Sequence, residues 1–339
     1  MKKLIHFLAA AGLVLIVLLI LFFPACTLSP SGITILDGDY SPPLYIEARF
    51  SSSDSMELFF TEKILQIEAE LQNDTTKTSS VCTIDPLLCT QEAESVFSVP
   101  IVFNSETEAG FPYTLFACAK DEAGNTLNFS VAFSGFNNRM PPIMLNEVRT
   151  EYTKPKVEFV EMLILEDGNI GGLVVYNAYD GEKSWYIFPS VEVKKDEILV
   201  LHYRTLEEGC RDEYGSLDES LGTESNTGAR DFWVPEARAR IGLNDVILVK
   251  SSCSGKILDA LLISESGKEV WKTEEMERAA KSAYESGAWS DGWEPKDAVC
   301  SDNVTTSRTL SRQKDGSWIT TASGGASPGK ANAAKPYVK

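Results

Sequence analysis

Histidine is scarce in this 339-residue chain, and bases are few for the number of acids. The only histidines are His6 and His202. Two histidines are too few for a zinc site built from several histidines or for a multi-histidine nuclease centre. Acids outnumber bases 49 to 31, which gives a net charge of -18. Such a chain is repelled by nucleic-acid phosphates and anionic lipid head groups unless a local basic patch intervenes.

Neither half of the chain supplies such a patch. Residues 26–142 carry 16 acids and 5 bases, and residues 143–339 carry 33 acids and 24 bases. Only the tail, 333–339, is basic, so we expect no nucleic-acid partner. Hydrophobic residues make up 43% of the chain. That share and the length are typical of a globular protein with two domains.

The N-terminus has the pattern of an export signal. Lys2 and Lys3 precede an unbroken apolar run over 7–23, and Ala25 and Cys26 follow. This order predicts a secretory signal peptide over 1–25. The cysteine after the small residue resembles the lipobox of bacterial, spirochaete-like lipoproteins. The resemblance implies cleavage before Cys26, which would carry the acyl chains.

The alternative is an uncleaved transmembrane anchor, because seventeen apolar residues approach the ~20 that span a bilayer. Whether the leader is cleaved before Cys26 or kept as an anchor, we expect an exported chain that is anchored to the membrane in the periplasm or at the cell surface. Residues 26–35 form the expected tether.

Six further cysteines remain when Cys26 is set aside. An even number in an oxidising compartment suggests disulfides, with about 15 possible connectivities. No CxxC motif occurs, so we expect no cysteine-bound metal and no cofactor. The candidate disulfide residues are Cys82, Cys89, Cys118, Cys210, Cys253 and Cys300.

The first half, 36–140, alternates polar and apolar residues between frequent turns. This pattern predicts a β-sandwich. The expected strands are 44–50, 56–60, 63–71, 96–103, 113–120 and 126–133, with Pro100 marking an edge or a bend. Asp121, Glu122 and Asn125 suggest either a calcium site or, more simply, a hairpin turn. The segments SDSMELFFTEKI and YTLFACAKDEAGNTL resemble bacterial Ig-like domains.

The second half, 143–332, begins after Pro141 and Pro142. Its motifs follow the order of the lamin-tail domain, an Ig-like sandwich. They include LNEV at 145–148, EFVE at 158–161, LNDVIL at 243–248 and a closing SR…W…PGKAN segment. The resemblance implies structural roles for six residues: Glu147, Glu161, Trp318, Pro328, Gly329 and Asn332. The fold class is therefore all-β, with two Ig-like β-sandwich domains in tandem.

Two insertions interrupt the second half. Residues 205–239 are polar and are expected to form a loop. Residues 264–300 contain KTEEMERAAKSAYES, where Thr273 would cap one short helix and Gly287 would end it. Trp271, Trp289 and Trp293 flank this helix. They would either pack the insertion onto the sandwich or form an aromatic patch for carbohydrate or peptide.

The sequence contains no recognisable catalytic constellation. His202 lies within a predicted strand, where a structural role is expected. Glu158 and Glu161 are three apart on a strand and face opposite sides. We therefore expect no enzyme but an envelope-anchored lipoprotein that acts as a binding, adhesion or structural module for an unknown protein or carbohydrate. The alternative is an accessory module or cryptic hydrolase of an exported enzyme system, with its site in 264–300. The oligomeric state stays open.

Overall fold

A computed structural model describes residues 38–181, 185–235, 241–253 and 255–339. The predicted signal peptide, most of the tether and Cys26 lie outside these ranges. Residues 38–41 are irregular backbone, and all described strands lie in residues 42–339. None of the described helices is both long and apolar enough to span a membrane.

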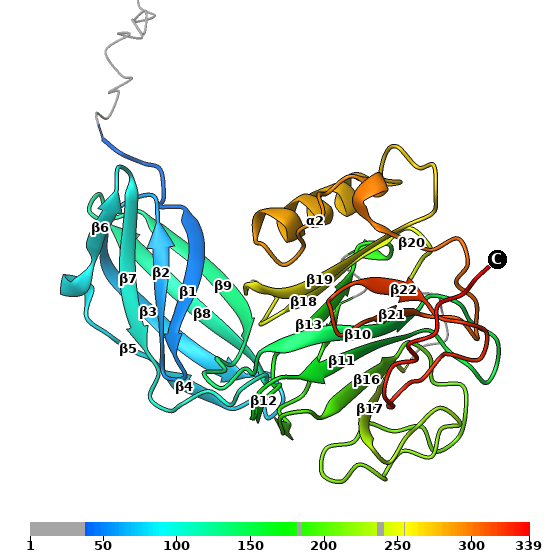
Figure 1. Cartoon of the computed structure of the whole chain (residues 1–339). Helices are drawn as coiled ribbons and strands as arrows, with labels where there is room; N and C mark the ends of the chain where they lie inside the picture. The colour runs from blue at the N-terminus through cyan, green and yellow to red at the C-terminus, as the bar shows by residue number, and fades with distance from the viewer. Residues whose placement is uncertain (1–37, 182–184, 236–240, 254) are drawn as a thin grey trace, which may run out of the picture. The chain divides into compact units, whose positions relative to one another are not determined.

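Residues 45–134 form two facing sheets (Figure 1). One has the strand order β1-β2-β7-β5, with β6 also pairing with β7, and the other has the order β4-β3-β8-β9. The bounds are β1 (Tyr45–Ser52), β2 (Ser55–Phe60), β3 (Ile64–Asn73), β4 (Ser79–Val81), β5 (Thr83–Ile84), η1 (Pro86–Leu88), β6 (Thr90–Ala93), β7 (Val96–Val102), β8 (Pro112–Asp121) and β9 (Thr126–Ser134). The six expected strands are confirmed. The core between the sheets takes its buried residues from β2, β3, β7 and β8.

Two details of this sandwich bear on the predictions. Pro100 lies in an inner strand rather than at an edge, where it pairs with Glu57 of β2. On its other side β5 pairs with β7 only as far as Ile101, and β6 pairs with β7 only from Ser98 back to Val96. Pro100 lies in the gap between them, so neither strand needs its missing N–H. The predicted hairpin turn after β8 is confirmed. There the Asp121 carboxylate accepts hydrogen bonds from the Asn125 backbone at 2.8 Å and from its side chain at 3.0 Å.

Residues 143–320 form the second group of sheets. A six-stranded sheet has the order β17-β16-β11-β10-β21-β22, a five-stranded sheet has the order β14-β13-β18-β19-β20, and β12 pairs with β15. The bounds are β10 (Ile143–Arg149), β11 (Phe159–Ile164), β12 (Gly168–Asn169), β13 (Val174–Asn177), β14 (Tyr186–Ile187), β15 (Glu192–Val193), β16 (Ile198–His202), β17 (Ala229–Trp233), β18 (Asp245–Lys250), β19 (Ile257–Ser264), β20 (Val299–Cys300), β21 (Leu310–Arg312) and β22 (Trp318–Thr320). One apolar core joins the two large sheets. The all-β prediction is therefore confirmed.

The first insertion differs from the expected loop. Its last part forms β17, which pairs in parallel with β16. Its sequence, ARDFW, is too short and too polar for the alternation of a strand to be visible. The pairing is also made with a strand nearly thirty residues earlier, which local sequence does not reveal.

The second insertion carries the only α-helix among the described residues, α2 (Glu274–Glu285). Thr273 caps it by accepting a hydrogen bond from the Met276 N–H at 3.2 Å, as predicted. Gly287 follows with φ +76°. Met276 and three alanines face the second core. Trp271 and Trp289 are buried in that core and Trp293 packs against it, which confirms that the insertion is packed onto the sandwich.

The disulfide prediction is wrong for this structure, because all six described cysteines are free. Cys82 acts as a small apolar side chain in the first core, and burial raises its pKa to about 11. Cys118 lies on the opposite, outward side of its sheet. Cys300 is exposed at the edge strand β20. The cysteines therefore occupy separate structural positions rather than facing pairs.

Candidate functional site

Two buried carboxylates meet across β10 and β11. Glu147 and Glu161 are paired in register, and both are fully buried. Sequence spacing tests only residues on one strand, so this cross-strand pair was missed. Burial raises the pKa of both carboxyls, and for Glu161 the neighbouring charge of Glu147 raises it further.

Both carboxylates are occupied by the closing segment of the chain. Glu147 accepts hydrogen bonds from the Ser327 N–H at 3.0 Å and from its hydroxyl at 2.6 Å. Glu161 accepts one from the Gly329 N–H at 2.7 Å and one from the Asn146 side chain at 2.5 Å. We call Glu147, Glu161 and their partners in 327–329 the closing latch. Because both carboxylates are hydrogen-bonded and have no exposed surface, they hold the structure together and are closed to a ligand.

Three of the six residues that the resemblance singled out belong to the latch: Glu147, Glu161 and Gly329. Gly329 adopts φ +72°, and a Cβ there would meet Ala229 at 2.9 Å, so glycine is required. Pro328 lies between two latch residues. The side chain of Asn332 donates to the carbonyls of Asn146 at 3.0 Å and Arg312 at 2.8 Å. Trp318 is not part of this cluster.

His202 forms a second buried polar group. Its Nε2 lies 2.7 Å from Asp231, and its ring stacks on Trp233 with the centroids 3.8 Å apart. His202 is fully buried and lies in β16, as predicted. An imidazole with no exposed surface is suited to packing rather than to proton transfer with a bound ligand.

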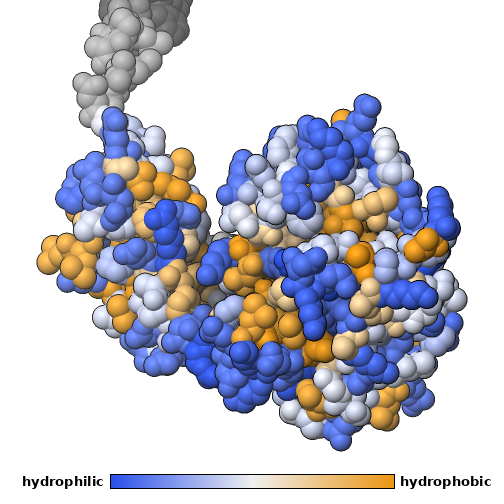
Figure 2. Space-filling model, viewed as in Figure 1, coloured by the Kyte–Doolittle hydropathy of each residue, from blue (hydrophilic) through white to orange (hydrophobic). Residues whose placement is uncertain are grey.

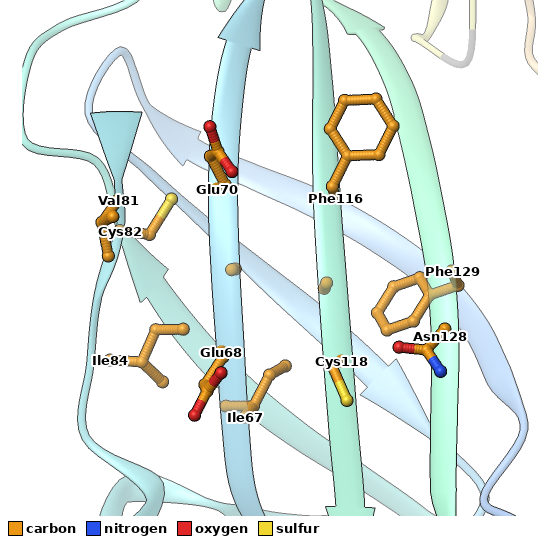
Figure 3. A pocket seen from close by; sticks show the side chains of 12 residues that line it. Ile67, Glu68, Glu70, Val81, Cys82, Ile84, Phe116, Cys118, Asn128 and Phe129 are labelled. Atoms are coloured by element: carbon orange, nitrogen blue, oxygen red, sulfur yellow. The ribbon is translucent and has the colours of Figure 1, made fainter. Parts of the chain in front are cut away.

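A shallow groove lies on the outward face of β3, β8 and β9 in the first sandwich (Figure 3). Glu68 and Glu70 of β3 stand beside Phe116 and Cys118 of β8. Phe116 is 47% exposed. No buried polar atom of this groove lacks a partner. Its chemistry therefore selects no particular ligand.

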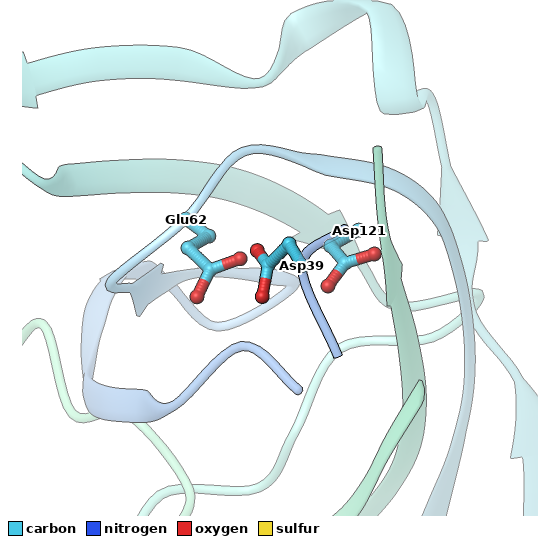
Figure 4. Close-up of side chains that lie close together, drawn as sticks. All are labelled: Asp39, Glu62 and Asp121. Carbon is cyan, nitrogen blue, oxygen red and sulfur yellow. The ribbon is translucent and has the colours of Figure 1, made fainter. Parts of the chain in front are cut away.

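Two other surface features also identify no particular ligand. The carboxylates of Glu62 and Asp121 lie within 4.8 Å of one another (Figure 4), but Asp121 is already used by its turn. Leu87 and Leu88 in η1 are 92% and 54% exposed. Figure 2 shows hydrophobic residues, in orange, at several places on the surface. Single exposed apolar residues are common on soluble proteins.

A pocket in the second sandwich has more informative chemistry. It has a volume of about 350 Å³, at the lower end of the range for small-ligand sites. The second insertion contributes residues 288–291 and 297–300, and the closing hairpin contributes Arg312 and residues 316–318. We call this site the insertion pocket.

Two residues that line the insertion pocket each have a buried N–H donor without a described partner. Trp289 is 8% exposed, and its Nε1 makes no hydrogen bond within the described ranges. Arg312 donates from Nη1 to Asp259 at 2.6 Å, but its buried Nε has no acceptor among the described atoms. A buried donor without a partner costs about 1–3 kcal/mol. Both nitrogens are inaccessible to solvent, so a ligand in the pocket would reach them only if these side chains moved.

Trp318 also lines the insertion pocket. The lamin-tail resemblance implied a structural role for Trp318. The structure places it in the edge strand β22, half-buried and only partly packed on the second core. Its ring lies 5.8 Å from the Arg312 guanidinium. The three tryptophans of the insertion gave the only sequence signal for this pocket.

Comparison with known proteins places the second sandwich in a family. Residues 141–334 match the profile of the family TP_1001_2nd, described as "protein second domain". This match spans more than half of the chain, and the chain belongs to that family. An uncharacterized protein of Treponema pallidum (strain Nichols) is 35% identical over 208 residues, which are 59% of this chain and 52% of that protein. The chain thus spans about half the length of this spirochaete relative.

Among solved structures, a DUF4785 family protein from Legionella pneumophila is similar with a TM-score of 0.23 and 10% identity. The match covers 65% of this chain and 55% of that one.

Proposed function

We propose that the chain is an envelope-tethered lipoprotein whose two Ig-like sandwiches, the second of lamin-tail type, form a non-catalytic binding module. The insertion pocket is its ligand site. The observation that carries the proposal is the insertion pocket itself, in which Trp318, Arg312, Asp291 and Asp297 come together from the insertion and the closing hairpin. The latch is buried and hydrogen-bonded, and His202 and Asp231 have no exposed surface, so both groups supply the scaffold rather than the site.

Tethering is supported by the basic and apolar leader that ends in Ala25 and Cys26. Two or three acyl chains would hold the protein to a membrane far more firmly than one. Cells that express the full chain are fed a clickable palmitate, with Cys26→Ser as the control. We expect label on the wild type and none on the variant. Absence of label from the wild type would favour an uncleaved anchor instead.

Binding is tested with the purified full chain on an array of glycans and peptides that represent envelope and host-matrix components. We expect retention of at least one of these ligands, with loss of retention in Trp318→Ala. The retained ligand is then incubated with the protein and analysed for cleavage. A cleaved ligand would replace the binding module with the hydrolase alternative, and an array with no Trp318-dependent signal would refute the pocket as the site.

A further inference from the structure

We propose that β9 of the first sandwich is a homodimer interface, at which it pairs antiparallel with β9 of a second copy of this chain. This surface is separate from the insertion pocket, so the inference goes beyond the proposed ligand site. β9 is nine residues long and is the last strand of its sheet, in the order β4-β3-β8-β9 (Figure 1). Within the described ranges no strand pairs with its outer side.

β9 lacks the features that normally protect an edge strand from pairing with another chain. Those features are charge, proline, a bulge or a very short length. The other edges of the first sandwich have them: β1 contains Glu47, Arg49 and two irregularities of register, β4 has three residues, β5 has two, and β6 contains Glu92 and an irregularity. β9 reads TLNFSVAFS, without charge or proline, and its register with β8 is unbroken.

The backbone groups of every second residue of β9 point away from the sheet. Just beyond β9, the Gly135 N–H donates to the Phe111 carbonyl at 2.8 Å and continues the β8–β9 ladder. Backbone hydrogen bonds alternate between the two sides of a strand, so the odd-numbered residues of β9 bond to β8 and the even-numbered ones point outward. The outward-pointing residues are Thr126, Asn128, Ser130, Ala132 and Ser134, of which the first four are exposed.

Two copies of β9 fit one another in a register that pairs all five outward-pointing residues. In this register Ser130 lies opposite Ser130 of the second copy on a two-fold axis, and Thr126 lies opposite Ser134 of the second copy. The same patch is then used by both copies, as in most homodimers. About ten backbone hydrogen bonds form, and the two four-stranded sheets become one.

The side chains of β9 match in the same register. On the core side, Leu127 lies opposite Phe133 of the second copy, and Phe129 lies opposite Val131. These four side chains are only partly buried in the single chain, so the added strand covers apolar surface. The outer side carries only small or neutral residues. No like charges therefore meet, although each copy has a net charge of -18, and no charge on β9 selects a charged peptide instead.

The two-fold register makes Ser130 the position for a cross-linking test. A hydrogen-bonded antiparallel pair has its Cα atoms about 5.5 Å apart, which lies within the range of ~4.4–6.8 Å that a disulfide spans. Ala132 is exposed on the same side of the same strand. It would lie about 14 Å from Ala132 of the second copy, too far for a disulfide. Ser130→Cys should therefore link two copies, and Ala132→Cys is the matched control.

The full chain is expressed in cells, oxidised with copper–phenanthroline and separated on a non-reducing gel. The wild type measures the background from the native cysteines, which include the exposed Cys300. We expect a disulfide-linked dimer from Ser130→Cys and only background from Ala132→Cys.

A second measurement follows the dimer at equilibrium, by sedimentation of the purified full chain in detergent. Ser130→Lys places two ammonium groups beside the axis and should raise the Kd of the dimer about tenfold. In Ala132→Lys the two charges lie farther apart than the Debye length of ~8 Å, so the Kd should not change.

Several results would overturn the inference, and none of them bears on the insertion pocket. Equal cross-linking of Ser130→Cys and Ala132→Cys, or none from either, would refute the two-fold register. A Ser130-dependent product of another mass would show that a different protein occupies this edge. A dimer that Ser130→Lys leaves as tight as the wild type would place the contact elsewhere on the chain.

Discussion

Replacement of Asp245 by asparagine should lower the free energy of unfolding at acidic pH and raise it at alkaline pH. Asp245 begins β18 and is fully buried. Its carboxylate accepts hydrogen bonds from the N–H groups of Tyr179 at 2.8 Å, Val246 at 2.7 Å and Gly242 at 3.3 Å. Burial nevertheless dominates and raises the pKa of Asp245 to about 7.

The sign follows from proton linkage. The folded chain holds the Asp245 proton up to about pH 7, whereas the unfolded chain releases it near pH 3.9. Between these values the folded state binds more protons, so stability falls as the pH rises. Three pH units at about 1.4 kcal/mol each give a loss of roughly 4 kcal/mol, complete above pH 7.

Asp245→Asn removes this pH dependence. The amide oxygen can still accept from Tyr179 and Val246, but the amide nitrogen cannot accept from Gly242, which costs about 1 kcal/mol. The Asn177 side chain also hydrogen-bonds Asp245, and its loss adds about 1 kcal/mol. We therefore expect the variant to be about 2 kcal/mol less stable than the wild type at pH 4. It should be about 2 kcal/mol more stable at pH 8, so the two stability curves cross near pH 5.

The assay is urea unfolding of the full chain, followed by tryptophan fluorescence at several pH values between 4 and 8. The difference between variant and wild type is the measured quantity, because other buried carboxyls contribute to both. A variant that is less stable than the wild type at pH 8 would refute the reasoning. It would mean that the three backbone donors outweigh the cost of burying the charge.

Further predictions concern the latch, the edge strand and DNA. Gly329→Ala should lower the melting temperature more than Gly316→Ala; both glycines have positive φ, but a Cβ meets atoms below 3 Å only at Gly329. Equal losses would contradict the close packing of the latch. Trp318→Ala should cost about 2 kcal/mol in urea unfolding, roughly half the value for a fully buried tryptophan, and a loss of 4 kcal/mol would place Trp318 in the core. Fluorescence polarisation at ~0.15 M salt should detect no binding of duplex DNA; sub-micromolar affinity would reveal a basic surface that the sequence does not show.

The sequence predicted those features that local patterns determine. Tyr113, Leu115, Ala117 and Ala119 occupy every second position of one strand, and the structure buries all four in the first core. Thr273 begins α2 because its hydroxyl satisfies a free N–H of the first turn. Periodicity and capping act over a few residues, so they are visible without knowledge of the partner strands.

Features that depend on distant pairing could not be predicted in this way. Glu147 and Glu161 meet because β10 and β11 pair in one particular register, which a single sequence does not specify. The insertion pocket joins residues 288–300 to Arg312 and Trp318, and it forms only when the insertion packs beside the closing hairpin. The disulfide prediction failed because it rested on cysteine number and compartment, neither of which contains spatial information.

The central claim is that the insertion pocket is the ligand site. The most direct test follows the indole N–H groups of the full chain by ¹H–¹⁵N spectroscopy; its six tryptophans give six indole signals, assigned by single replacements with phenylalanine. Saturation with a ligand retained on the array should shift the signals of Trp289 and Trp318, which line the pocket, and should leave the signal of Trp271, which does not line it, in place. Unchanged Trp289 and Trp318 signals in the saturated complex would contradict the account.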